Sequence, residues 1–265
     1  MLRGTCAFFG LLGGKDALQD LIAHHIQIVR DGPAPDPTPA NPDKLAEYVG
    51  LPLILWYIVG AQGFWEGGKE LTPENMRVLT RDVLDRAVTA GLKVIWLECC
   101  NEPNRVGTAD YAALVNAMYE AAAPYRFQIG IEIVCCGVGR HDQTNLNWVK
   151  AVIAAGIPQD VILAPHDYPV GMNPHNPETD FHDLEDQDAA WDAAAQGRRM
   201  AVGEVGYWDG TDGLDEAQAM AALKVELDKF VEMGYIAVTT YQLRNGPTMT
   251  PIDRCGLTSA DGVWK

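Results

Sequence analysis

Eight short apolar runs alternate along this 265-residue chain with segments whose apolar residues recur every three or four positions. Such runs favour buried strands, and the longer period favours helices that pack one face on a core. The predicted strands are residues 5–12, 26–30, 53–59, 93–100, 128–136, 161–166, 200–204 and 236–242. The predicted helices are residues 16–24, 42–49, 73–90, 109–123, 144–155, 183–196 and 215–233.

Stop signals between these segments support the alternation. A glycine directly after a helix and before a strand suits a left-handed C-cap. Four glycines have this position: Gly91, Gly156, Gly197 and Gly234. Thr72 followed by Pro73 is typical of an N-cap with proline at the first helical position.

Repeated strand–helix units predict an α/β fold with a parallel sheet and helices on its faces. Eight units favour closure into a compact (β/α)8 TIM barrel that forms a single domain over residues 1–265, with a short or missing last helix. An open doubly wound sheet is the alternative. It would be expected to carry a glycine-rich phosphate loop, and residues 10–14 do not match the GxGxxG pattern.

The net charge and the hydrophobicity of the chain exclude some classes of binding partner. The formal net charge of −16 opposes binding to nucleic acid, whose phosphates need clustered basic residues. No apolar run approaches the ~20 residues of a membrane helix, so no membrane partner is expected. A monomer is the default expectation. Residues 1–14 resemble a short secretory signal but lack a small-x-small cleavage site, which predicts an intracellular or phage-associated location, or secretion with a signal absent from this chain.

Cysteine and histidine spacing predicts neither metal nor cofactor. Two adjacent pairs, Cys99–Cys100 and Cys135–Cys136, lie within apolar runs, where reduced thiols pack as small hydrophobic side chains. A CxxC pattern is absent, and the histidines show no ligand spacing typical of a metal site.

A glutamate stands at the end of two predicted strands. Glu102 follows strand 93–100 and precedes Pro103, and Glu204 ends strand 200–204 and is flanked by Gly203 and Gly206. In a barrel, functional residues gather where strands lead into helices. By the two-residue period of a strand, Glu98, Cys100 and Glu102 share a face, which places Glu98 about 13 Å deeper than Glu102. A buried carboxylate needs a partner, and Arg30 is the candidate for Glu98 or Glu204.

The string Glu98-Cys-Cys-Asn-Glu-Pro103 resembles the Glu-x-x-Asn-Glu-Pro signature of retaining glycoside hydrolases of clan A, notably the family 5 cellulases and mannanases. The resemblance implies that Glu102 is the general acid/base at the end of the fourth strand. It further implies that Glu204, which ends the seventh strand in a similar sequence, is the nucleophile.

Further site residues follow from the same resemblance. His166 and Tyr168 resemble the His-x-Tyr pattern that lines the cleavage subsite, and Arg30 stands where the family has an arginine that keeps the nucleophile ionised. The family usually has a tryptophan at the end of the eighth strand as a sugar platform, where this chain has Tyr241, whose ring can stack instead. A histidine that the family often has near the third strand is not evident.

Three other side chains suit a sugar site by their chemistry. Asn101 can hydrogen-bond the 2-hydroxyl of a sugar, an interaction that strengthens in the transition state. Trp65 and Trp208 follow the third and seventh strands, and their rings can stack on the apolar faces of pyranoses.

These residues predict a retaining glycoside hydrolase that cleaves a neutral β-linked oligo- or polysaccharide, a β-glucan or β-mannan, in the endo mode by double displacement. Ionised Glu204 is expected to raise the pKa of Glu102. One alternative is a carbohydrate-binding barrel without catalysis. Another is a metal-dependent barrel hydrolase that uses His166, Asp167 and Glu204.

Overall fold

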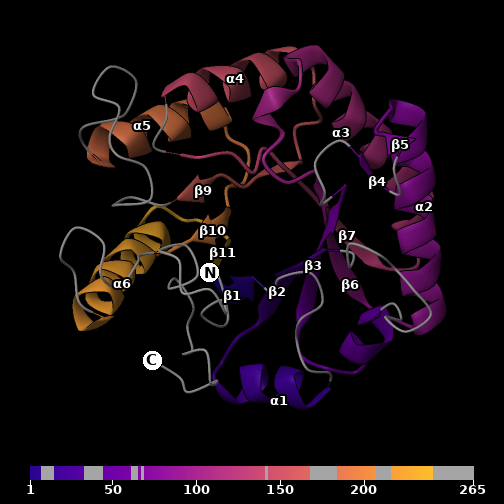
Figure 1. Ribbon diagram of the computed structural model, residues 1–265, viewed down its shortest axis with the longest axis horizontal. Coiled ribbons are helices and arrows are strands. Elements are labelled where there is room, and N and C mark those ends of the chain that lie inside the picture. Colours follow the sequence, from indigo (N-terminus) through magenta and orange to yellow (C-terminus); the bar gives the residue numbers. More distant parts are fainter. Residues whose placement is uncertain are drawn as a thin grey trace.

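The computed structural model describes residues 1–6, 15–32, 44–60, 65–66, 69–140, 143–167, 184–206 and 216–240. Strands and helices alternate within them (Figure 1). The strands are β1 (Leu2–Cys6), β2 (Ile28–Asp31), β3 (Ile54–Val59), β4 (Trp65–Glu66), β5 (Lys69–Glu70), β6 (Val94–Cys99), β7 (Gly130–Cys135), β8 (Ile162–Leu163), β9 (His166–Asp167), β10 (Val202–Val205) and β11 (Ala237–Thr240). The α-helices are α1 (Lys15–Ala23), α2 (Pro73–Ala90), α3 (Thr108–Ala122), α4 (Gln143–Ala154), α5 (Leu184–Ala195) and α6 (Glu216–Glu232), with 3₁₀ helices η1 (Lys44–Tyr48), η2 (Pro103–Arg105) and η3 (Ala123–Tyr125).

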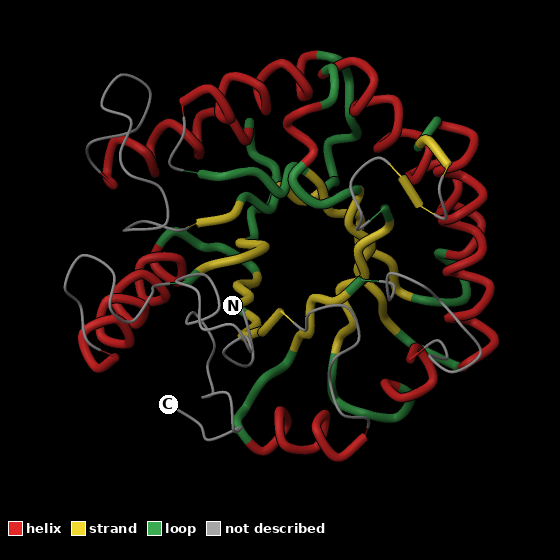
Figure 2. The backbone as a smooth tube through the Cα atoms, viewed as in Figure 1, coloured by secondary structure: helices red, strands yellow, loops and turns green. Residues whose placement is uncertain are grey.

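Nine of the described strands form one parallel sheet in the order β8-β7-β6-β3-β2-β1-β11-β10-β9. β8 and β9 are two pieces of the predicted sixth strand, which is interrupted at Pro165, a residue with no N–H to donate. The N–H of Leu163 in β8 donates to the carbonyl of Arg199 (3.1 Å), and the N–H of Ala201 donates to the carbonyl of Leu163 (2.9 Å). The sheet therefore curls round with the helices outside (Figure 2), which is consistent with a (β/α)8 barrel.

The sheet is buried on both faces, as expected for parallel strands. A small inner cluster fills the space that the strands enclose, and a large outer cluster packs between the strands and the helices. The inner cluster consists of Ile28, Trp56, Trp96, Val134, Ile162, Ala164, Ala201 and Ala237. It forms the base on which the polar residues at the strand ends lie.

The first strand and the second helix differ from their predicted bounds. β1 begins at Leu2, because its main chain pairs with β11 from Leu2 onward; residues 7–12 of the prediction lie outside the described residues. Gly4 permits β1 to pair closely with both neighbours, since a β-carbon there would lie 2.6 Å from Cγ2 of Thr239 in β11 and 2.5 Å from Cγ2 of Ile28 in β2. The helix predicted over 42–49 is only the short 3₁₀ helix η1. Pro52 follows closely, and a proline disfavours helical backbone in the residue that precedes it, so the helix cannot continue.

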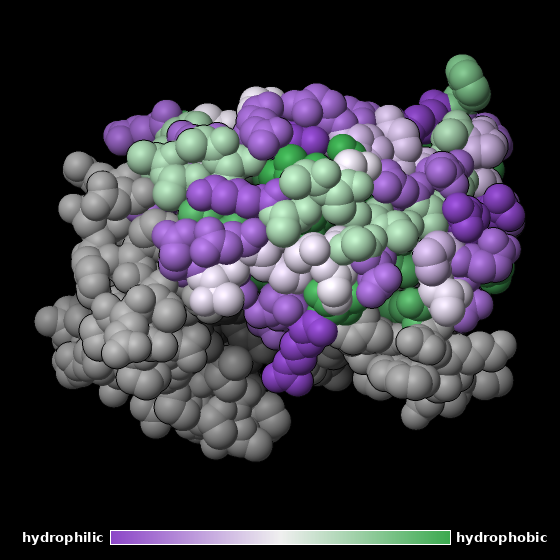
Figure 3. Space-filling view, turned by 90° about the horizontal axis from the view of Figure 1, so that it is seen from above, coloured by the Kyte–Doolittle hydropathy of each residue, from purple (hydrophilic) through white to green (hydrophobic). Residues whose placement is uncertain are grey.

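The predicted helix caps are confirmed. The side chain of Thr72 accepts a hydrogen bond from the N–H of Asn75 (3.2 Å), and Pro73 occupies the first turn of α2. The four C-cap glycines have φ between 77° and 98°. Hydrophilic and hydrophobic residues are intermixed over the outer surface seen in Figure 3. Among the described helices, none combines the length and apolarity needed to cross a membrane.

Candidate active site

Arg30, near the end of β2, connects the polar side chains of the neighbouring strand ends. Its Nε and Nη2 donate to the two carboxylate oxygens of Glu98, at 2.6 and 2.7 Å. Nη1 donates to Oε1 of Glu204 at 2.6 Å, and Nη2 also donates to Oδ1 of Asn101 at 2.7 Å. The guanidinium carbon lies 5.8 Å from the ring centroid of Trp56 in the inner cluster. One cation therefore binds two buried carboxylates and the amide that precedes Glu102.

Burial and charge act in opposite directions on Arg30. Burial disfavours its charged form, but Glu98 and Glu204 together raise the pKa of Arg30 well above its usual value. The guanidinium is thus held charged between its two carboxylates. Arg30 was predicted to pair with Glu98 or Glu204, and it pairs with both.

The strand alternation predicted after Glu98 is wrong at Cys100. Cys100 has a φ of 62° and packs in the outer core together with Cys99. This left-handed residue reverses the alternation, so that Asn101 rather than Cys100 faces Arg30. The carboxylate of Glu98 is consequently part of the site, because it binds the same guanidinium as Glu204.

A β-bulge turns Glu204 toward Arg30. β10 pairs with β11 at Val202 and again at Val205, with a shift of register between them. The extra residue re-aims the side chain that follows it. Beneath the bulge, the carbonyl of Gly203 accepts hydrogen bonds from the Thr239 hydroxyl and from the Cys6 thiol, the latter at 3.4 Å. Burial raises the pKa of Cys6 to about 12, so this thiol keeps its proton and remains a donor.

Glu102 is the exposed member of the carboxylate pair. Its side chain is 63% exposed, against 10% for Glu204. The backbone of Glu102 has a φ of 47°, and its N–H donates to the carbonyl of Gly137 at 3.0 Å. Uncommon backbone of this kind in a non-glycine residue often occurs at functional sites. Solvent can therefore reach Glu102, whereas Glu204 is buried at the bottom of the strand-end cluster.

His166 lies between the two carboxylates. Its Nδ1 is 3.7 Å from an oxygen of Glu102 and 3.7 Å from an oxygen of Glu204. Its Nε2 lies 3.4 Å from Nη2 of Arg30. Because a guanidinium can only donate, Nε2 is the acceptor, and in the neutral ring the proton is on Nδ1. This N–H therefore faces both carboxylates.

Two glycines make room for the His166 ring. A β-carbon on Gly137 would lie 2.9 Å from Nε2, and one on Gly203 would lie 3.0 Å from Cδ2. Both distances are shorter than ordinary carbon contacts. The ring is therefore held between the two backbones.

The predicted rise in the pKa of Glu102 does not agree with this geometry. The close contact with His166 lowers the pKa of Glu102 most, while burial opposes the shift and the charges of Arg30 and Arg105 add to it. The net pKa lies below the ordinary value for glutamate. The prediction considered the charge of Glu204 and omitted the cationic side chains around Glu102.

We expect His166→Ala to raise the pKa of Glu102. The change removes the largest cause of the lowered pKa and leaves the smaller contribution of Arg30. Carbon-13 NMR titration of the Glu102 carboxyl, assigned by its loss in Glu102→Gln, would measure the shift. His24→Ala, at an exposed histidine directly after α1, is the control and should not change the titration. An equal pKa of Glu102 in the wild type, His166→Ala and His24→Ala would show that His166 does not lower it.

Some predicted residues do not join this cluster in the described structure. Tyr168, Trp208 and Tyr241 lie outside the described residues. Trp65 belongs to β4, which pairs with β5 in a separate two-stranded sheet. Asp167 is turned away from the site, and its Oδ2 accepts a hydrogen bond from Arg140 at 2.8 Å. Among the described residues, no group of three or more histidine, cysteine, aspartate or glutamate side chains is arranged to hold a metal ion.

Sequence reasoning missed several residues that support the site: Cys6, Gly137, Arg140, Gly203 and Thr239. Gly137 and Gly203 lie at the ends of predicted strands 128–136 and 200–204, a position that could have marked them. Arg140 carried no signal, because its partners come from distant segments.

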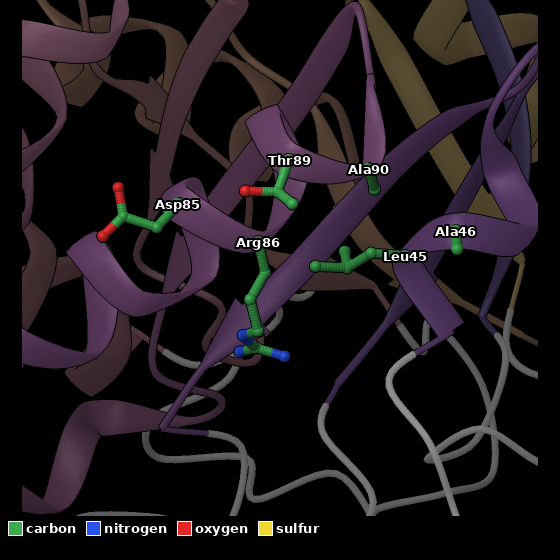
Figure 4. A pocket seen from close by; sticks show the side chains of 6 residues that line it. All are labelled: Leu45, Ala46, Asp85, Arg86, Thr89 and Ala90. Carbon is green, nitrogen blue, oxygen red and sulfur yellow. The ribbon is translucent and has the colours of Figure 1, made fainter.

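A pocket of about 330 Å³ lies elsewhere, between η1 and α2 (Figure 4). Its lining residues are Leu45, Ala46, Asp85, Arg86, Thr89 and Ala90. The two charged side chains already have local partners: Arg86 pairs with Asp82 at 2.9 Å, and Asp85 accepts a hydrogen bond from Tyr125 at 2.7 Å. The pocket lacks converging catalytic groups, so the strand-end cluster is the better candidate site.

Comparison with solved structures finds proteins of similar fold that align over nearly all of this chain. The structure of XacCel5A in complex with cellopentaose superposes with a TM-score of 0.67 at 13% identity, over 100% of this chain and 96% of that one. A hyperthermostable endocellulase gives 0.67 at 13% identity, over 99% of this chain and 89% of that one. The fold is that of clan A glycoside hydrolases.

A third neighbour of this fold is a β-glucuronidase from Bacteroides uniformis, with a TM-score of 0.66 at 14% identity. All of this chain aligns with it, but the chain spans only 33% of that protein's length. No protein-family model and no curated protein matches the sequence. The likeness to clan A glycoside hydrolases that the sequence motifs indicated is thus confirmed for the fold.

Proposed function

We propose that this chain is a retaining glycoside hydrolase, with Glu102 as general acid/base and Glu204 as nucleophile, built as a single (β/α)8 barrel domain over residues 1–265. The observation that carries the proposal is the position of the His166 ring. Its Nδ1 lies 3.7 Å from both carboxylates, one exposed and the other buried and held by Arg30.

The reaction proceeds in two displacements. First, the Glu204 carboxylate attacks the anomeric carbon while the protonated form of Glu102, which its lowered pKa makes the minor form at neutral pH, donates its proton to the leaving oxygen. This step gives a glycosyl ester on Glu204. Then Glu102 takes a proton from water, the water oxygen attacks the anomeric carbon, and Glu204 leaves as carboxylate. Arg30 supports both steps, because Nη1 donates to Oε1 of Glu204 and so holds the carboxylate in place.

The carboxylate spacing favours retention over inversion. Since both glutamate oxygens lie 3.7 Å from one nitrogen, they are separated by no more than twice that distance. Retaining enzymes hold their carboxyl groups about 5–5.5 Å apart, and inverting enzymes about 6.5–9.5 Å. Most of the inverting range exceeds the limit set by His166.

The substrate is a neutral β-linked polysaccharide, a β-glucan or β-mannan, cleaved in the endo mode. The endocellulase of the same fold supports this choice, as does the complex of XacCel5A with cellopentaose. Oδ1 of Asn101 already accepts from Arg30, so its Nδ2 is the atom that donates to a sugar 2-hydroxyl. Tyr168, Trp208, Tyr241 and Trp65 remain predicted sugar contacts.

The two alternatives have less support. A barrel that only binds carbohydrate does not require a buried carboxylate held by a cation and aimed at a second carboxylate. A metal site built from His166, Asp167 and Glu204 is disfavoured, because Asp167 points to Arg140 on the other side of its strand.

Hydrolysis of a panel of β-glucan, β-mannan and xylan oligosaccharides, followed by proton NMR, tests the proposal. We expect cleavage of at least one substrate with the β-anomer as first product. An α-anomer as first product would indicate inversion, and loss of turnover on addition of a chelator would support the metal-dependent alternative. Absence of hydrolysis with retained oligosaccharide binding would favour the binding barrel.

A further inference from the structure

A second buried ionic cluster lies directly behind the candidate site. Nη1 of Arg140 donates to Oδ2 of Asp167 at 2.8 Å, and Nη2 donates to Asp188 on α5. Arg140 and Asp167 are fully buried. The guanidinium carbon also lies 5.3 Å from the ring centroid of Phe230 on α6 and 5.6 Å from that of Tyr235. The cluster therefore joins β9 to both flanking helices.

Arg140 binds two consecutive residues of β9. Its backbone N–H donates to the carbonyl of His166 at 2.7 Å, and its side chain binds Asp167. Trp191 on α5 fixes Arg140 in turn, since its Nε1 donates to the Arg140 carbonyl at 2.8 Å. Because side chains alternate along a strand, His166 faces the site while Asp167 faces the helices.

The strand that Arg140 holds is short and closely seated. β9 contains two residues and follows the interruption at Pro165. The ring of His166 lies so close to Gly137 and Gly203 that a β-carbon on either would come within 2.9 or 3.0 Å of it. Displacement of β9 would move Nδ1 of His166 away from the two carboxylates that it faces.

A buried ion pair is a poor source of stability, because desolvation offsets its attraction, and apolar replacements often serve as well. Such a pair can instead hold the segments that it joins in one arrangement. We propose that Arg140 and Asp167 are positioning residues, which hold β9 so that the His166 ring stays between Glu102 and Glu204. The consequence for catalysis rests on the proposed function, whereas the effect on the ring does not.

Asp167→Asn in the full chain tests the inference, with nitrogen-15 NMR of the imidazole rings as a readout that needs no activity. We expect both ring nitrogens of His166, assigned by their loss in His166→Gln, to change their chemical shifts, while the signals of His24 and His25 stay as in the wild type. If Asp167→Asn does not fold, Arg140→Lys replaces it, because lysine keeps the charge but cannot bind both aspartates as a guanidinium does.

Kinetics provide the second readout. On a substrate that the wild type cleaves, we expect kcat to fall on the order of 10- to 100-fold with little change in KM, since the binding surface is intact and only the alignment is lost. Glu132→Gln is the matched control. It breaks an Arg199–Glu132 pair with distances of 2.8 and 2.6 Å, and it should alter neither readout.

Unchanged His166 signals in a folded Asp167→Asn or Arg140→Lys protein would overturn the inference. Equal changes in the Glu132→Gln control would also overturn it, because they would reflect a general loss of structure. If the wild type cleaves no glycoside, the proposed function fails, but changed ring signals would still support the positioning role.

Discussion

Glu204→Ala is expected to reduce kcat by at least about 10⁴-fold on every glycoside that the wild type cleaves, the scale on which an essential nucleophile acts. The methyl group cannot attack the anomeric carbon, and it leaves the Nη1 donor of Arg30 without its carboxylate. The fold should persist, because Arg30 keeps its two hydrogen bonds to Glu98. Added azide fills the space of the lost carboxylate and should restore turnover, giving a glycosyl azide of inverted configuration.

Glu102→Ala is the matched comparison, since it removes the other carboxylate of the pair. Loss of an acid/base group costs about 10²–10⁴-fold, and mostly on poor leaving groups that need a proton. With Glu204 intact, azide attacks the glycosyl ester from the opposite face and should give the retained product. The same azide configuration from both variants would disprove the assignment of the two roles. Wild-type activity in either variant would show that its glutamate is structural.

The sequence predicted the parts of the fold that depend on local order. Helix α2 has the predicted bounds, and strand ends that carry Glu102 and Glu204 lie on one curled sheet. Hydrophobic periodicity and glycine caps decide such features within a few residues. The same signals place Arg30 near the end of its strand, from which its long side chain reaches both glutamates.

What could not be predicted depends on departures from regular geometry. Cys100 and Cys136 both have a φ of 62° at neighbouring strand ends, and nothing in an adjacent cysteine pair predicts left-handed backbone. Tyr111 binds both turns: its hydroxyl donates to the carbonyl of Cys99 (2.6 Å) and accepts from the N–H of Cys136 (3.0 Å). The shift of register in β10 likewise changes the face of the sheet on which the Glu204 side chain lies. These features arise from contacts between distant segments, which periodicity does not record.

Arg30→Met is expected to abolish activity and to lower the free energy of unfolding by about 3–5 kcal/mol, the usual cost of leaving a buried charge unpaired. Glu98 is fully buried and loses both of its hydrogen bonds to Arg30, and Glu204 loses the donor to its Oε1. Urea unfolding followed by tryptophan fluorescence would measure the change. Arg199→Met breaks the exposed pair with Glu132 and should cost only about 0–1 kcal/mol.

The double variant Arg30→Met with Glu98→Leu separates stability from catalysis. Apolar side chains of similar volume can replace a buried ion pair with little loss, so most of the unfolding free energy should return. Activity should not return, because Glu204 still lacks its cation and Asn101 lacks the donor to its Oδ1. A double variant that regains both would mean that Arg30 serves only to neutralise Glu98. One that regains neither would mean that the guanidinium organises the strand ends beyond its charge, through the simultaneous hydrogen bonds that methionine and leucine cannot replace.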